Sequence, residues 1–295
     1  MIESLLKLSD ALVARVAGTA PGLVSIHPGS RAQRTAMLWR PGVLVTSEQG
    51  LPPDTEVPVV LPGGFRARAV LAGRDPGTNV AVLRLELDGP ALPDAADPHV
   101  GGLALLLGAA TDGSPTARLA LVHRIGPAWE SAGGGRIDQL ISLDARLSGR
   151  DEGGPVLDAA GGLLGMSTLG PRRRVLVIPA ATVNRVLAPL LAGQMSRGWL
   201  GLGLQPVSIP AGWQASAGLE TGLMVISLTT QGPAEEAGVL PGDILLEVDG
   251  TPAPHPRAVA KALGSNSVGK TVMLRLLRGG LPVELSATVV ARPAA

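Results

Sequence analysis

The chain has 295 residues, of which 45% are hydrophobic, and its formal net charge at pH 7 is +1. That length and apolar content allow two domains with separate cores and exclude a disordered chain. A nearly neutral charge excludes the strongly basic surface that is typical of nucleic-acid binding. Cysteine is absent, which excludes disulfides, thiol catalysis and cysteine-held metals.

The N-terminal segment predicts a helix over residues 1–20, because its apolar side chains recur at spacings that fit one helical face. We expect that face to pack on the rest of the protein or on another subunit. The segment lacks the basic start and apolar run of a secretory signal, so the predicted location is the cytoplasm. The periplasm is the alternative if the true start lies upstream. The apolar residues are Ile2, Leu5, Leu6, Leu8, Leu12, Val13 and Val16.

Short apolar runs separated by Gly and Pro clusters follow, a pattern typical of strands joined by tight turns. One group of runs occupies residues 23–26, 37–39, 43–45, 57–61, 68–71 and 80–87, and a second occupies residues 103–108, 119–123, 139–143, 162–168 and 175–178. We expect each group to close a small β barrel, with a site in the cleft between the barrels. A helix over residues 182–191 and a linker over residues 192–196 complete this region. The basic run at residues 172–174 is interpreted as a solvated loop, with an anionic contact as the alternative.

Residues 144–155, DARLSGRDEGGP, resemble the segment Asp-Ala-Ala-Ile-Asn-Pro-Gly-Asn-Ser-Gly-Gly-Pro around the nucleophile of the HtrA/DegP family of trypsin-like serine proteases. The alignment needs no gap. It places Glu152 where the family has its nucleophilic serine. It also places Arg150 where the family has a glycine whose N–H helps to form the oxyanion hole.

Two earlier segments resemble the other catalytic landmarks of that family, in the expected order. Residues 42–49, GVLVTSEQ, resemble Gly-x-Ile-Leu-Thr-Asn-x-His and place Gln49 at the general base. Residues 75–83, DPGTNVAVL, resemble Asp-Pro-x-Thr-Asp-Leu-Ala-Val-Leu and place Asn79 at the orienting aspartate. Since a carboxamide accepts no proton at a useful pH, the resemblance implies a family member with a degenerate triad and no catalytic residues. Glu152 is interpreted as neutral drift, or else as a side chain that fills the oxyanion hole or pairs with Arg150.

From residue 197 the chain resembles the PDZ domain of the same family, through RGWLGL at 197–202, GPAEEAG at 232–238 and PGDILLEVDG at 241–250. The resemblance implies a mainly β protein, with a trypsin-like double β barrel over residues 21–192 and a PDZ domain over residues 197–293. It implies that a polypeptide C-terminus binds a loop of backbone N–H groups and then pairs with the following strand. The implied peptide-binding residues, some of which are equally suited to the domain core, are Leu200, Gly201, Leu202, Leu204, Val259, Ala262 and Leu263.

The expected function is therefore that of a pseudoprotease, an adaptor or regulator in protein quality control that binds polypeptides or protein C-termini without cleaving them. Homo- or hetero-oligomers with related subunits are an accompanying expectation. Two alternatives are residual or reassigned proteolysis, and a metal- or ligand-binding pseudoenzyme. Scattered histidines disfavour both a new catalytic pair with Ser47 or Ser148 and a metal site. We expect no cofactor, no nucleic acid and no membrane span. The histidines are His27, His99, His123 and His255.

Overall fold

The computed structural model describes residues 2–27, 33–52, 54–90, 92–131, 133–146, 148–170, 173–193, 198–264 and 267–291. The chain divides into two compact units, residues 1–131 with 136–195, and residues 196–295 with the short segment 132–135. Of the segments discussed above, Leu147, Arg172 and residues 194–197 lie outside the described residues. Each unit has its own hydrophobic core and is described by itself.

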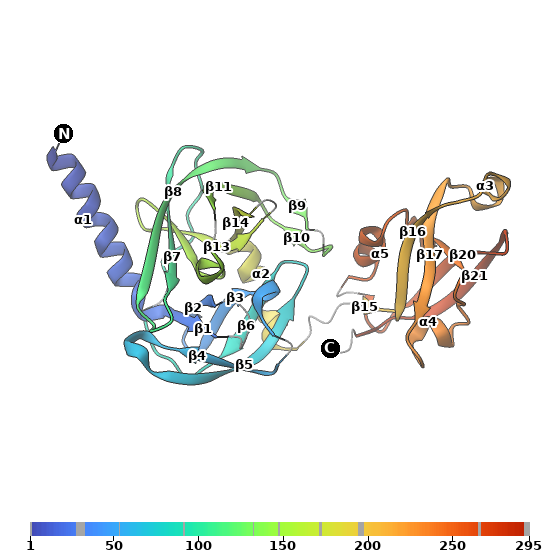
Figure 1. Ribbon diagram of the computed structural model, residues 1–295, viewed down its shortest axis with the longest axis horizontal. Coiled ribbons are helices and arrows are strands. Elements are labelled where there is room, and N and C mark those ends of the chain that lie inside the picture. The colour runs from blue at the N-terminus through green and yellow to red at the C-terminus, as the bar shows by residue number, and fades with distance from the viewer. Residues whose placement is uncertain are drawn as a thin grey trace. The chain divides into compact units, whose positions relative to one another are not determined.

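The first unit contains a closed barrel of six antiparallel strands in the order β1-β2-β3-β6-β5-β4 (Figure 1). Pairing of β1 with β4 closes it. Val24 and Ile26 alternate along β1 and, with Leu44 and Leu83, face the barrel core. The strands are β1 (Leu23–Ile26), β2 (Arg34–Arg40), β3 (Val43–Ser47), β4 (Glu56–Val60), β5 (Arg66–Asp75) and β6 (Val80–Arg84).

A second closed barrel follows in the same unit, in the order β11-β14-β13-β12-β7-β8. Ile141 and Leu143 alternate into its core with Val175 and Val177 of the neighbouring strand. Its strands are β7 (Leu103–Ala109), β8 (Pro115–Gly126), β11 (Leu140–Arg146), β12 (Pro155–Asp158), β13 (Leu163–Leu169) and β14 (Arg174–Pro179). The two barrels confirm the predicted mainly β, double-barrel fold. A short hairpin that the sequence did not predict, β9 (Trp129–Glu130) and β10 (Arg136–Ile137), lies between β8 and β11.

Two helices flank the barrels. α1 (Ile2–Thr19) packs Leu12 and Val16 against the second barrel, whereas Ile2, Leu5 and Leu6 are exposed. α2 (Ala180–Leu191) buries apolar side chains at the i, i+3, i+4 and i+7 positions of one face, namely Val183, Val186, Leu187 and Leu190. Among the helices described, none has the length and apolar content needed to cross a bilayer.

The second unit is built on a sheet in the order β16-β17-β18-β20-β21, with β19 beside β18. Its core lies between this sheet and α5 and includes Leu223, Leu245, Leu274 and Val259. The elements are β15 (Gly198–Trp199), β16 (Leu202–Ser208), α3 (Ala211–Ala217), β17 (Thr221–Leu228), α4 (Pro233–Glu236), β18 (Ile244–Val248), β19 (Thr251–Pro252), α5 (Pro256–Ala262), β20 (Thr271–Arg278), β21 (Leu281–Thr288) and β22 (Val290–Ala291).

Candidate functional site

The structure brings together the three positions that the sequence analysis assigned to a degenerate triad. Gln49 lies in a 3₁₀ turn, Glu48–Gly50, directly after β3. Asn79 precedes β6 in the left-handed conformation, with φ at 58°, which asparagine adopts more readily than most residues. Glu152 follows the 3₁₀ turn Gly149–Asp151 of the second barrel. The first barrel thus supplies two of the side chains and the second barrel supplies one.

These side chains form one hydrogen-bonded group, which we call the Glu152 cluster: Arg34, Ser47, Gln49, Asn79, Glu152 and Thr168. Gln49 Nε2 donates a hydrogen bond to Glu152 Oε1, which also accepts one from Ser47 Oγ at 3.0 Å. Asn79 Nδ2 donates to Ser47 Oγ at 2.9 Å and to Thr168 Oγ1 at 2.5 Å, while Asn79 Oδ1 accepts from the backbone N–H of Gln49 at 2.8 Å. The Glu152 side chain has no exposed surface, so the carboxylate is enclosed by its partners.

The charge that balances Glu152 comes from β2 of the first barrel. Arg34 Nε lies 3.0 Å from Glu152 Oε2, and the arginine side chain is 13% exposed. Arg34 reaches this point by lying flat over Gly50, where an added Cβ would stand 2.2 Å from Arg34 Nε. The alternative interpretation, in which Glu152 pairs with Arg150, is therefore wrong. Arg150 is exposed, and its carbonyl accepts a hydrogen bond from Thr35 Oγ1 at 2.7 Å.

The turn before Glu152 uses its own backbone donors internally. The N–H of Glu152 donates to the carbonyl of Gly149 at 3.2 Å, and the N–H of Asp151 donates to the carbonyl of Ser148 at 3.2 Å. A trypsin-like oxyanion hole needs donors that point at the substrate carbonyl. In this conformation the N–H of Glu152 points instead into its own turn.

The two glycines after Glu152 allow close backbone contact, Gly153 with β2 of the first barrel and Gly154 with β7 of its own barrel. A Cβ at Gly153, where φ is +89°, would stand 2.2 Å from the carbonyl oxygen of Thr35. A Cβ at Gly154 would stand 1.9 Å from the carbonyl oxygen of Leu107. Neither position has room for a side chain, so the turn Gly153-Gly154-Pro155 is required by packing at this point.

The first unit also holds a serine–histidine pair outside the Glu152 cluster. Ser25 Oγ lies 3.0 Å from His27 Nε2, a serine–histidine contact that the sequence analysis missed because it considered only Ser47 and Ser148. Ser25 has no exposed surface and also accepts a hydrogen bond from Gln33 Nε2 at 2.7 Å. Its hydroxyl is therefore inaccessible to a substrate. Among the described residues, no three His, Asp or Glu side chains converge in a way that could hold a metal ion.

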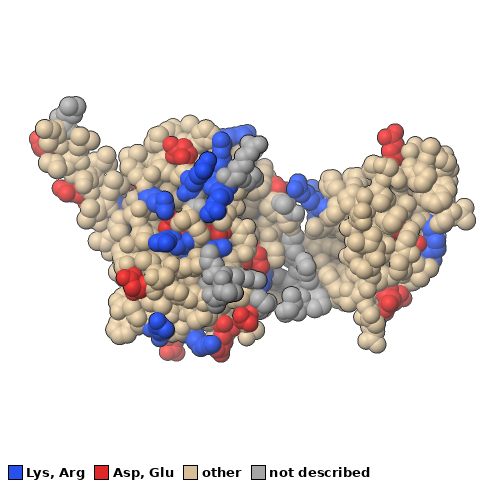
Figure 2. All heavy atoms as spheres, viewed as in Figure 1, with Lys and Arg blue, Asp and Glu red and all other residues tan. Residues whose placement is uncertain are grey.

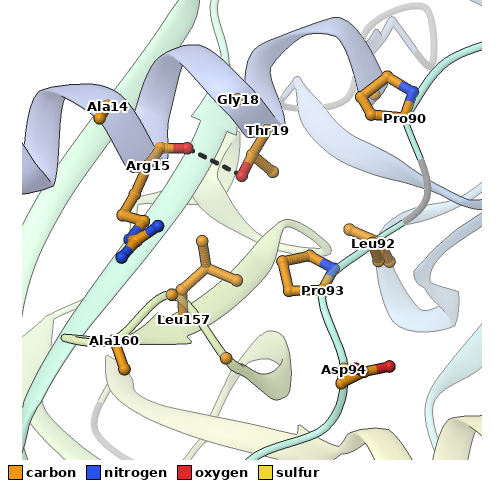
Figure 3. A pocket seen from close by; sticks show the side chains of 13 residues that line it. Ala14, Arg15, Gly18, Thr19, Pro90, Leu92, Pro93, Asp94, Leu157 and Ala160 are labelled. Atoms are coloured by element: carbon orange, nitrogen blue, oxygen red, sulfur yellow. Dashed lines mark hydrogen bonds between the residues drawn. The ribbon is translucent and has the colours of Figure 1, made fainter.

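A pocket of about 420 Å³ lies beside α1, and none of its lining residues belongs to the Glu152 cluster (Figure 3). Arg15 points from α1 into it, and its side chain lies over Gly161, where an added Cβ would stand 2.7 Å from Arg15 Cδ and Nε. Leu92, Asp94 and Leu157 line the opposite wall. The pocket is thus a feature of the packing of α1 and is separate from the cleft residues.

In the second unit, the predicted peptide-binding residues divide into two sets by burial. Leu200, Val259 and Leu263 are buried in the core, and Gly201 is buried in the loop before β16. The three partly buried residues, which pack against that core from β16 and α5, are Leu202, Leu204 and Ala262. β16 is an end strand of the sheet order in the described residues, so its outer edge is placed to pair with a peptide strand.

The loop before β16 directs its backbone donors away from the domain. The carbonyl of Leu200 accepts a hydrogen bond from the N–H of Ala234, and that of Gly201 accepts one from the N–H of Thr229, both at 2.9 Å. In a trans peptide the N–H points opposite to the carbonyl, so the N–H groups of Gly201 and Leu202 point outward. Gly201 has φ at +76°. This arrangement is suited to a carboxylate.

Comparison with known proteins agrees with this division. Residues 34–166 match the family described as trypsin-like peptidase domain, and residues 198–289 match the family described as PDZ domain. A probable periplasmic serine endoprotease DegP-like of Bartonella henselae is 31% identical over 251 residues, which cover 81% of this chain and 49% of the relative. The HtrA-type protease AlgW, solved with a tripeptide, is 26% identical with a TM-score of 0.63, and the match covers 96% of this chain and 98% of that chain. The chain belongs to the HtrA family.

This membership confirms the predicted double barrel followed by a PDZ domain. A probable periplasmic serine endoprotease DegP-like of Brucella suis is 28% identical over 264 residues, or 85% of this chain. The HtrA-family chain spans about half the length of these curated relatives, 51% of the Brucella protein. Because they are named periplasmic, the expected cytoplasmic location is wrong.

Proposed function

We propose that this HtrA-family protein binds polypeptides by their C-termini at the PDZ domain and does not cleave them. The observation that carries the proposal is the burial of the Glu152 carboxylate against Arg34, Ser47 and Gln49, at the position where relatives in the family have a nucleophile. Amide hydrolysis in this fold needs a hydroxyl nucleophile and an imidazole base. The cluster supplies a carboxylate and a carboxamide in their places.

The arrangement of the cluster disfavours residual catalysis in two further ways. Glu152 Oε1 accepts hydrogen bonds from Ser47 and Gln49, and Oε2 lies against Arg34, so both oxygens are engaged and shielded from a substrate carbonyl. The N–H of Glu152 is bonded within its own turn, so a tetrahedral intermediate would lose that donor. Removal of the triad in a protease of this chemistry lowers kcat by about 10⁶.

Binding at the PDZ domain is supported by the outward N–H groups of Gly201 and Leu202 and by the end strand β16. Leu202, Leu204 and Ala262 would receive the apolar side chains of the bound peptide, the first two from β16 and the third from α5. A small or medium apolar C-terminal residue fits this lining. We further propose that the protein works in the periplasm, the compartment named for its relatives, as an adaptor or regulator alone or with related subunits.

Two assays with the full chain test the proposal. Unfolded casein should be cleaved no faster than in buffer, and turnover abolished by a serine-directed inhibitor would contradict the claim. Peptides with a free C-terminus should bind more tightly than their amidated forms, and equal affinities would exclude carboxylate capture. Leu204→Asp should abolish binding. The matched control is Leu281→Asp, at an exposed leucine of the opposite end strand β21, which should leave binding unchanged.

A further inference from the structure

The second barrel carries a positively charged surface that the peptidase and PDZ assignments leave without a role. Figure 2 shows Lys and Arg side chains gathered on the displayed face of the first unit. On the outer face of β8, β11 and β14, three exposed arginines form what we call the arginine face: Arg124, Arg146 and Arg174. The whole chain has a net charge of only +1, so this concentration is local.

The strand register places these arginines close together. Arg146 of β11 and Arg174 of β14 are direct cross-strand partners, so their side chains project from the same face. Arg124 is paired with Ser142, which is in turn paired with Leu176, two residues from Arg174 on the same face. Strand spacings put the Cα atoms of Arg124 and Arg174 within about 12 Å of each other.

No carboxylate of the described residues forms an ion pair with any member of the arginine face, whereas half of the other described arginines of the first unit have such a partner. Like charges directly opposite each other on neighbouring strands destabilise a sheet. The repulsion between Arg146 and Arg174 therefore lowers the stability of the protein when no anion is bound. A bound anion would offset this repulsion.

A hollow of about 340 Å³ opens between the two paired arginines. It is lined by His123, Leu143, Asp144, Ala145, Arg146 and Arg174. Asp144 is engaged elsewhere, because its Oδ1 accepts a hydrogen bond from the N–H of Leu121 at 2.7 Å. The hollow thus combines two arginines with His123, Asp144 and two apolar side chains, and its two guanidinium groups outnumber its one carboxylate.

We propose that the arginine face binds an acidic segment of a polypeptide, with an Asp or Glu side chain seated in the hollow between Arg146 and Arg174. A hollow of this size fits one side chain, whereas the flat surface of a bilayer would not fill it. Nucleic-acid binding normally adds aromatic stacking, and no aromatic residue lines the hollow. The site belongs to the first unit and does not depend on the function proposed for the PDZ domain.

The test uses the full chain and a labelled peptide with six glutamates, acetylated and amidated at its ends so that carboxylate capture by the PDZ domain plays no part. The matched probe carries six glutamines. Fluorescence anisotropy should show binding of the glutamate peptide alone, and the affinity should fall as salt rises. Arg146→Ala with Arg174→Ala should weaken it by at least about tenfold, because charge-assisted hydrogen bonds are lost.

The control variant, Arg40→Ala with Arg66→Ala, removes two exposed arginines elsewhere on the first unit and should leave the affinity unchanged. The melting temperature of the unliganded arginine-face variant should not fall, since a like-charge contact has been removed. Equal affinity of the arginine-face variant and the unmodified protein would overturn the proposal. The assigned class of partner would be wrong if the protein bound phosphatidylglycerol vesicles or a single-stranded oligonucleotide more tightly than the peptide, and if that binding depended on the same arginines.

Discussion

Arg34 of the first barrel and Glu152 of the second barrel form an ion pair, with 3.0 Å between Nε and Oε2. Glu152 has no exposed surface, so the pair is shielded from solvent and from salt. In a protease of this fold the same place would be open to a substrate. Here a side chain of the protein itself occupies it, and the two barrels are held together by opposite charges.

Glu152→Gln should destabilise the first unit by about 3–5 kcal/mol, because it leaves the Arg34 guanidinium buried without its counter-charge. Urea unfolding of the full chain measures the effect. The double variant Arg34→Met with Glu152→Gln should recover most of the loss, since neither buried charge remains. Arg150→Ala is the control and should change stability by no more than about 0.5 kcal/mol, because Arg150 is exposed. Equal loss in the single and double variants would show that the ion pair has no special role.

Gly50→Ala should displace Arg34, because an added Cβ would stand 2.2 Å from Arg34 Nε. We expect a loss of about 1–3 kcal/mol, the usual cost of overpacking. Gly18→Ala is the matched control, since no atom lies within 4 Å of a Cβ at that position of α1. Thermal unfolding compares the two. A neutral effect of Gly50→Ala would mean that the arginine reaches Glu152 by another path.

Restoring the four family residues should make a serine at position 152 reactive if the fold around that position is intact. The variant combines Gln49→His, Asn79→Asp, Arg150→Gly and Glu152→Ser, and labelling by a fluorophosphonate probe is the measurement. Single changes should give almost nothing, because triad members act as a unit. Adding Arg34→Gln should increase labelling, since Glu152→Ser removes the carboxylate that balances the charge of Arg34. A folded variant that neither labels nor cleaves would show that the turn Gly149–Asp151 cannot form an oxyanion hole.

Acid should weaken the second unit through Asp243. Burial is the largest single influence on the pKa of this carboxyl and raises it, but hydrogen bonds from Arg278 and from the N–H of Leu240, with the charge of Arg278, together lower it below 3.8. A lowered folded pKa stabilises the protein above the unfolded pKa, and that contribution is lost as the pH falls through the folded value.

Asp243→Asn should therefore cost about 1–3 kcal/mol at pH 7, and this cost should shrink progressively as the pH falls below 3.8. Arg278 keeps about a third of its side chain exposed, 36%, which favours the lower end of that range. Hydrogen exchange of the backbone amides in β18 and β20, followed as a function of pH, measures this loss of stability. Asp112→Asn, at a fully exposed carboxyl of the first unit, should leave the exchange at β18 and β20 unchanged. If Asp243→Asn lowered stability by the same amount at every pH, the proposed link between the pKa of Asp243 and stability would be wrong.

Local patterns predicted much of this fold. The short apolar runs of β1 and β3, and the periodicity of α2, were predicted from the residues that form them, whereas the run of β12 was missed. The grouping of Gln49, Asn79 and Glu152 was predicted from their motifs, and the structure places them in one hydrogen-bonded cluster. The β9–β10 hairpin was missed because its two-residue strands carry no periodicity.

The partner of Glu152 could not be predicted from the sequence. Arg150, two residues away, was the nearest cation along the chain, whereas Arg34 is 118 residues distant and meets Glu152 only because the barrels close against each other. A signal was present in Gly50, which follows Gln49 and leaves space for a long side chain, but a glycine in a turn has many explanations. Long-range charge pairing depends on the packing of whole domains, which local patterns do not contain.

Gly153 is fixed in size by the backbone carbonyl of Thr35 in the first barrel, and Gly154 by that of Leu107 in its own barrel, whether or not any bond is ever cleaved. A sequence signature centred on these glycines therefore indicates how this turn packs within its own barrel and against the other one, and it gives no information about catalysis. A set of proteins that share this signature can include both enzymes and non-enzymes, because both match the motif equally well. Two positions that can vary distinguish enzymes from non-enzymes. They are the residue directly before the glycines and the distant position in β2 whose side chain can reach that residue.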